Sequence, residues 1–197
     1  MTDEKRADLR IERLPIEDAR ARAEEVGLPA MLAELSVFRI ALTNPVIAKG
    51  VSDLLLALLT NGRLDPRLRE LIIMRIGWVS GAEYEWTQHW RVARRVPMEP
   101  DDILGVRDWE SHQGYGDIER AVLRATDETL QNGFISDLTW AKLLTLIPDE
   151  GTLFELVIAI GNWQMFANLL RSLRVPLEDG VEPWPPDGLR PLIPNVG

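Results

Sequence analysis

Residues 65–95 read DPRLRELIIMRIGWV, then SG, then AEYEWTQHWRVARR. Asp65 followed by proline is a helix start signal, because aspartate caps free backbone N–H groups and proline suits the first helical position. Apolar residues then recur at helical spacing as far as Val79. Gly81 interrupts this pattern, and a further helix is expected over 82–95. The stretch therefore predicts two consecutive helices joined by a short turn.

Glu85 and His89 are the chemically distinctive pair of this stretch. They are four residues apart, so a helix places them on one face, within hydrogen-bond reach. Histidine titrates near neutral pH, and a neighbouring carboxylate orients or charges it. The pair is therefore a candidate proton-handling unit. Glu83 points to another side of the same helix and is expected to be a solvated or helix-start carboxylate, favoured by the positive end of the helix dipole.

Glu70 is a candidate third member of this unit. It lies one turn into the preceding helix, directly before the apolar run 71–73. A carboxylate beside such a run either faces solvent or is buried with a partner. If the two helices pack as a hairpin, Glu70 returns close to Glu85 and His89.

The rest of the chain predicts an all-α protein. Strand patterns are nearly absent, while helical periodicity recurs from Ile16 to Leu173. One domain of about eight helices is expected over residues 1–175, with a proline-rich arm over 176–197 that holds six of the thirteen prolines. The arm is expected on the surface or on a neighbouring subunit. Outside the central pair, helices are expected near 16–26, 30–42, 46–59, 101–106, 107–111, 117–130, 136–147 and 149–172, the last apolar on nearly every side and therefore buried.

Composition and charge exclude several classes of function. The net charge of −9 argues against nucleic acid and anionic membranes as partners. No uninterrupted apolar run approaches the ~20 residues of a membrane span, and the charged N-terminus lacks a signal sequence, so a cytoplasmic protein is expected. The chain contains no cysteine, which excludes disulfides and thiol chemistry.

Further residues are candidates for binding. Trp86 offers an apolar wall beside the Glu85–His89 pair, and Arg75 or Arg39 could bind a substrate carboxylate through the guanidinium. Both arginines interrupt apolar segments, where side chains that reach back to solvent are commoner. His112 is expected in a surface loop. The indole and amides of Trp163, Asn162, Gln164 and Asn168 need partners or line a pocket.

The motif of residues 65–94 resembles the carboxymuconolactone decarboxylase family, which shares an all-α fold with the alkylhydroperoxidase AhpD. The resemblance lies in the Leu68–Ile76 run, the small-residue break, and the Glu-Tyr-Glu-Trp sequence followed by His89. The peroxidase branch of the family carries Cys-x-x-Cys-x-x-x-His. Aligned on His89, its cysteines fall on Ala82 and Glu85, so dithiol peroxidase activity is excluded here.

The resemblance implies a cofactor-free lyase of the decarboxylase branch, acting on a small lactone acid from aromatic-compound catabolism. His89 would be the acid/base, Glu85 its orienting partner and Glu70 the end of the relay. It also implies a homo-oligomer, a trimer or hexamer.

Two alternatives remain open. One is a helical oligomerisation or ligand-binding protein that keeps the fold without the chemistry. The other is a metal-dependent hydrolase or isomerase, with Glu70, Glu85 and His89 as ligands; the absence of a two-histidine motif disfavours it, and no metal or other cofactor is expected.

Overall fold

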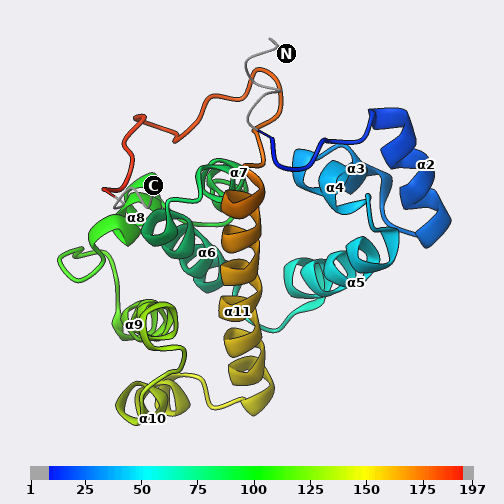
Figure 1. Cartoon of the computed structure of the whole chain (residues 1–197). Helices are drawn as coiled ribbons and strands as arrows, with labels where there is room; N and C mark the ends of the chain where they lie inside the picture. Colours follow the sequence, from blue (N-terminus) through cyan, green and yellow to red (C-terminus); the bar gives the residue numbers. More distant parts are fainter. Residues whose placement is uncertain (1–8, 193–197) are drawn as a thin grey trace. The chain divides into compact units, whose positions relative to one another are not determined.

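The computed structural model describes residues 9–192 and is built from helices (Figure 1). It contains ten α-helices and no strand within this range, which confirms the all-α class. The described residues divide into two compact units. The first comprises the chain as far as Asn61 together with Leu169–Val181, and the second comprises Gly62–Asn168 together with the residues from Glu182 onward. This division does not follow the expected boundary at residue 175, which stays a prediction.

The first unit shows where local sequence signals suffice and where they fail. α2 spans Ile16–Val26 as expected and ends at Gly27, whose φ of 66° is the left-handed conformation that glycine favours. The single helix expected over 30–42 is wrong, because the extended backbone of Leu35 separates two shorter helices. The N–H of Ser36 then donates to the Glu178 carboxylate at 2.9 Å, which satisfies the new helix start. The unit also contains α3 (Ala30–Ala33), α4 (Ser36–Ala41), α5 (Pro45–Leu56) and the π-helical turn η1 (Ala57–Asn61).

The second unit holds the two helices of the central motif. Its elements are α6 (Pro66–Ser80), α7 (Glu83–Ala93), α8 (Pro100–Gly105), the 3₁₀ turn η2 (Val106–Asp108), α9 (Asp117–Asn132), α10 (Asp137–Leu146) and most of α11 (Glu150–Leu173), whose last residues belong to the first unit.

α6 and α7 form the predicted hairpin, and small residues allow their close approach. The Asp65 side chain caps α6 by accepting from the N–H groups of Arg67 and Leu68. Gly81 ends the helix with a φ of 65°. A Cβ on Gly77 would lie 3.2 Å from the backbone nitrogen of Trp86, so a larger residue would push the helices apart.

α11 departs from the expectation of burial on every side. Its buried residues include Leu156, Ile160 and Trp163, yet Phe154 is 70% exposed and Met165 is 40% exposed. By length and composition alone this helix could cross a membrane, and half of its apolar window is buried inside the protein. A core helix passes the same test, so this is weak evidence for a membrane span. Cytoplasmic location stays a prediction.

The C-terminal segment from Glu182 packs into the second unit. Trp184 is only 3% exposed and joins an aromatic cluster with Trp78 and Trp86. Its indole N–H donates at 2.8 Å to Glu83, which begins α7 as a helix-start carboxylate and is partly buried rather than fully solvated. The Trp86 indole donates in turn to the carbonyl of Pro185 at 2.8 Å. These contacts fix the segment along α6 and α7.

Trp184→Ala is predicted to lower the free energy of unfolding by about 3–5 kcal/mol, because it empties a buried aromatic site and leaves Glu83 without its donor. Chemical denaturation monitored by circular dichroism measures this change. Leu192→Ala, at a fully exposed position of the same segment, serves as the control and should change stability by less than about 0.5 kcal/mol. Equal effects for the two variants would contradict a core role for Trp184.

Candidate functional site

The α6–α7 hairpin brings Glu70, Glu85 and His89 together. Glu70 comes from α6, and the other two residues lie one turn apart on α7. Nδ1 of His89 lies 2.8 Å from a carboxylate oxygen of Glu70, and Nε2 lies 3.4 Å from one of Glu85. The hairpin therefore returns Glu70 to the histidine, as the packing argument predicts. The shorter contact belongs to Glu70, so the geometry favours Glu70 over Glu85 as the orienting partner.

Trp163 of α11 completes the surroundings of the imidazole. Its indole N–H donates to Nε2 of His89 at 3.3 Å, and the two rings meet edge to face. In the neutral ring, the Nδ1 proton donates to Glu70 while Nε2 accepts from Trp163. Nε2 also faces Glu85, so it is the nitrogen at which a proton can be exchanged.

The cluster is nearly closed to solvent. The side chain of Glu70 is fully buried, that of Glu85 is 6% exposed, and that of His89 keeps 12% exposure. A buried carboxylate requires compensating partners. Glu70 has two, because Nε of Arg69 also donates to it at 3.2 Å.

Burial and mutual charge shift the pKa values of this cluster. Burial raises the pKa of Glu85 to about 7, with Glu70 adding to the rise and His89 opposing it. For His89, burial acts to lower the pKa, but the charges of Glu70 and Glu85 and the hydrogen bond that His89 donates to Glu70 raise it overall. A carboxyl group that titrates near neutral pH therefore lies beside an imidazole whose pKa is raised, an arrangement suited to general acid–base chemistry.

Arg69 and the specific contact of Trp163 were not identified from the sequence. A polar indole within an apolar helix signals that a partner exists, but not which one. Trp163 and His89 are 74 positions apart along the chain, so only the tertiary fold reveals their pairing. Arg69 directly precedes Glu70, and no spacing or motif in the sequence marked it as a partner of that carboxylate.

The predicted substrate-binding residues have other partners. Trp86 is fully buried among tryptophans. Arg75 forms a two-pronged ion pair with Asp127, at 2.7 and 2.8 Å. Arg39 belongs to the first unit and donates to the carbonyl of Leu14. The substrate contacts expected of these residues stay untested predictions.

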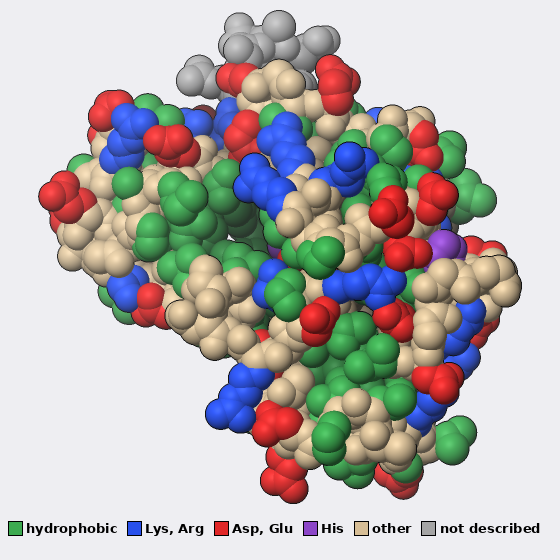
Figure 2. Space-filling view, turned by 180° about the vertical axis from the view of Figure 1, so that it is seen from behind, with side chains coloured by type: hydrophobic (Ala, Val, Ile, Leu, Met, Phe, Trp, Pro, Cys, Tyr) green, Lys and Arg blue, Asp and Glu red, His purple; other side chains and the backbone are tan. Residues whose placement is uncertain are grey.

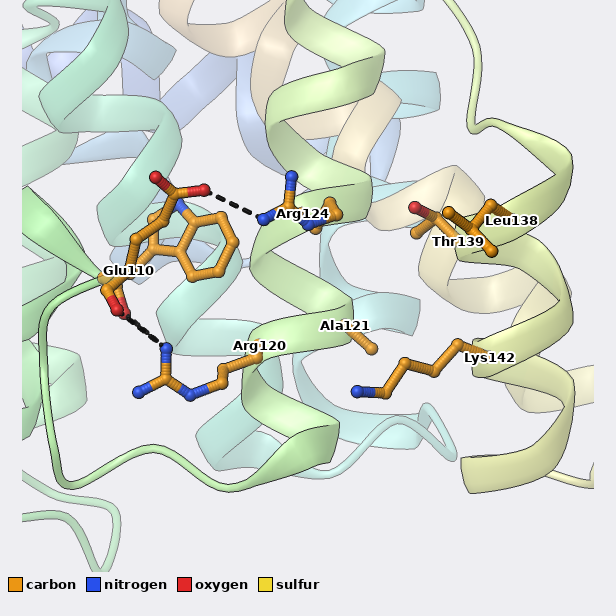
Figure 3. A pocket seen from close by; sticks show the side chains of 8 residues that line it. Glu110, Arg120, Ala121, Arg124, Leu138, Thr139 and Lys142 are labelled. Atoms are coloured by element: carbon orange, nitrogen blue, oxygen red, sulfur yellow. Dashed lines mark hydrogen bonds and ion pairs between the residues drawn. The ribbon is translucent and has the colours of Figure 1, made fainter.

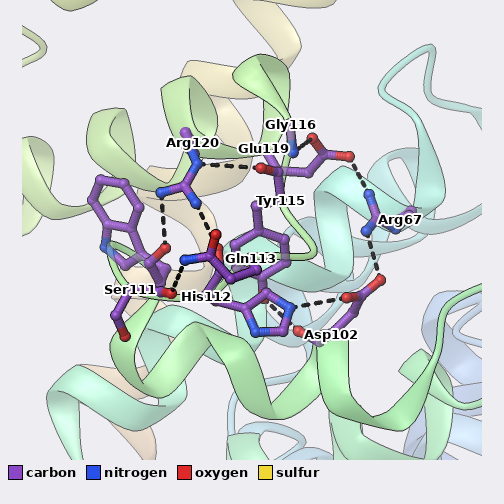
Figure 4. A network of polar contacts seen from close by, with 10 residues as sticks. Arg67, Asp102, Ser111, His112, Gln113, Tyr115, Gly116, Glu119 and Arg120 are labelled. Atoms are coloured by element: carbon purple, nitrogen blue, oxygen red, sulfur yellow. Dashed lines mark hydrogen bonds and ion pairs between the residues drawn. The ribbon is translucent and has the colours of Figure 1, made fainter.

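The second histidine belongs to a separate polar network rather than to an open surface loop (Figure 4). His112 lies 3.0 Å from the carboxylate of Asp102, which also pairs with Arg67 at 2.8 Å. These ionic contacts, with burial opposing them, lower the pKa of Asp102. Arg67 continues the network to Glu119. His112 is half-buried, so the surface-loop expectation is wrong.

Acidic, basic and histidine side chains also occur outside the cluster. Within residues 9–192, no group of three or more histidine, cysteine, aspartate or glutamate side chains is arranged to hold a metal ion. On the face shown in Figure 2, basic side chains are interspersed with acidic ones. Two pockets of the second unit are lined by residues other than Glu70, Glu85 and His89.

Solved structures with a similar fold include proteins of several activities. One, from Agrobacterium tumefaciens, is described with reference to the antioxidant defence protein AhpD; it is 20% identical over 70% of this chain and 94% of its own, with a TM-score of 0.64. A variant of the debrominase Bmp8 bound to 2,3,4-tribromopyrrole is 16% identical over 86% and 92%, with a TM-score of 0.69. A peroxidase-related protein from Silicibacter sp. TM1040 is 12% identical over 86% and 89%, also at 0.69. At these identities the likeness shows the fold alone.

The sequence itself also resembles a known family. No curated protein matches the chain significantly. The model of the carboxymuconolactone decarboxylase family matches residues 45–128, a range that includes Glu70, Glu85 and His89. The chain has the AhpD-like all-α fold and no cysteine. Residues 45–128 thus resemble the carboxymuconolactone decarboxylase family, in a chain that contains no cysteine.

Proposed function

We propose that the protein is a cofactor-free lyase that decarboxylates a small carboxylated lactone or a related acid from aromatic-compound breakdown. The observation that carries this proposal is the buried cluster in which His89 lies between Glu70 and Glu85. The family match supports the general class of enzyme. The reaction itself is proposed from the chemistry of the cluster.

The reaction requires charge stabilisation and one proton. The bond between the carboxylate and the adjacent carbon breaks, CO₂ leaves, and the electron pair flows into a conjugated carbonyl. Protonated His89 then donates its Nε2 proton to the resulting carbanion or enolate. Glu70, held by Arg69 on its other oxygen, keeps the ring oriented and stabilises the imidazolium.

The charge of the cluster suits an anionic substrate. Arg69 and protonated His89 carry positive charge, while Glu70 carries negative charge. Glu85, with a pKa of about 7, is half protonated at neutral pH and so adds little repulsion. Its protonated form also lies next to Nε2, where it can return a proton to the ring after each turnover.

His89→Gln and Glu70→Gln are each predicted to lower the turnover number by about 100-fold or more, because the proton donor or its orienting partner is lost. CO₂ release from a panel of lactone acids provides the measurement. His112→Gln is the matched control, since it removes the other histidine and lies in a different network. Thermal unfolding must show that each variant remains folded.

The same panel distinguishes the alternatives. Folded variants that keep full activity on a confirmed substrate would falsify the role of the cluster. Saturable binding of lactone acids without any turnover would instead favour a ligand-binding protein, an alternative consistent with the low exposure of His89. Elemental analysis of the purified protein tests the metal-dependent alternative.

The pH dependence is predicted to report on Glu85. As pH rises through about 7, Glu85 ionises and adds a negative charge beside the bound anion, so kcat/KM should fall. Glu85→Gln keeps the shape of the side chain without the ionisation and should remove this inflection. Glu83→Gln, on another side of α7, should retain it. An inflection unchanged in Glu85→Gln would assign the titration to another group.

The protein is also proposed to be a homo-oligomer, a trimer or hexamer. Exposed apolar side chains on α11, among them Phe154 and Val157, support this proposal because such residues are common in subunit interfaces. Sedimentation velocity should show a stable assembly at micromolar concentration, and Phe154→Lys should weaken it. Arg171→Gln, an exposed position on the same helix, should not. A wild-type monomer would contradict the proposal.

A further inference from the structure

A second candidate binding site lies away from the His89 cluster. A pocket of about 430 Å³ opens between α9, α10 and the turn at Trp109 and Glu110 (Figure 3). This volume falls within the range of small-molecule sites. The pocket is lined by Trp109, Glu110, Arg120, Ala121, Arg124, Leu138, Thr139 and Lys142.

The walls of this pocket are mainly apolar. Trp109 is held in place because its indole N–H donates to Asp127 at 2.9 Å. Ala121 is small and leaves room above α9. On α10, Leu138 is 83% exposed and forms an apolar side of the pocket. Trp109 and Ala121 are each only 4% exposed, so an apolar ring or chain would bury mainly the surface of Leu138.

The polar part of the lining is predominantly cationic. Arg120, Arg124 and Lys142 contribute three positive charges, against one negative charge from Glu110. Figure 3 shows Lys142 reaching from α10 toward Ala121. Such a concentration of positive charge is notable in a chain of net charge −9. The lining therefore complements an anion.

The present partners of Arg120 and Arg124 leave their positive charges available to an anionic ligand. The guanidinium of Arg120 donates to backbone carbonyls, those of Glu110 and Tyr115 among them, and within residues 9–192 it has no carboxylate partner. Arg124 lies over the Trp109 ring and pairs with Glu110 at 2.9 Å. Both members of that pair are more than half exposed, so it is weak and readily exchanged.

We propose that this pocket binds a small aromatic carboxylate. The aromatic ring would lie against Trp109 and Leu138, and the carboxylate would pair with Arg124 and Lys142, replacing their exposed pairs with Glu110 and Asp117. Arg120 adds a fixed positive charge behind the site. The proposal is independent of the reaction proposed for His89, because no residue is shared between the two sites.

Isothermal titration calorimetry with 2-naphthoate tests the site. Wild-type protein should bind it saturably, and the uncharged analogue 2-naphthalenemethanol should bind at least about tenfold more weakly. The double variant Arg124→Gln/Lys142→Gln should raise the Kd for 2-naphthoate by about tenfold or more, since two charged contacts are lost. Leu138→Ser should also weaken binding. Arg171→Gln, an exposed arginine outside the pocket, should leave it unchanged.

The His89→Gln variant separates this site from the proposed active site. Binding of 2-naphthoate that persists in His89→Gln and is lost in the double variant supports the proposal, whatever the outcome of the activity assays. Absence of saturable binding at millimolar 2-naphthoate, or binding that depends on His89 and not on Arg124 and Lys142, would overturn it. So would a self-association of the protein that Leu138→Ser abolishes without any ligand binding, because the apolar wall would then be a subunit interface.

Discussion

The hydrogen bond between Glu70 and His89 is the constraint on which the second unit depends. A fully buried carboxylate is unfavourable unless its oxygens are paired, and here the imidazole and Arg69 supply the pairing. The bond also determines how α6 and α7 must pack, since it joins one helix to the other. The close approach at Gly77 permits that packing. Fold stability and proton chemistry therefore share a single interaction.

Neighbouring residues surround this bond with a second carboxyl group and an indole. Without Glu85, the Glu70–His89 pair would be an ordinary buried ion pair. Glu85 places a second carboxyl group next to the free side of the ring, and burial keeps that group near its neutral form. The indole N–H of Trp163 donates a hydrogen bond to Nε2 of His89. The same burial that makes a charge on Glu85 unfavourable raises its pKa to about 7, while the neighbouring carboxylates raise the pKa of His89.

Local signals predicted most of the helices and the core of the candidate site. Proline, glycine and capping residues act over a few positions, so α2 and the start of α6 follow from the sequence. Helical spacing alone places Glu85 beside His89. The break at Leu35, the donor Trp163 and the contact between Trp184 and Glu83 could not be predicted, because each depends on residues far along the chain. The prediction from apolar composition that α11 is buried on nearly every side was also wrong, because a helix can present apolar residues to solvent as well as to a core.

The docking of the C-terminal segment has a consequence for how the protein is made. The partners Trp86 and Pro185 are 99 positions apart, so the aromatic cluster beside the α6–α7 hairpin stays incomplete until residue 185 has been synthesised. Contacts of such long sequence separation slow folding, because the loop must close before they form. Until then the tryptophans of α6 and α7 offer an apolar surface to other proteins. Trp184 and Pro185 thus cover an apolar surface that α6 and α7 would otherwise expose.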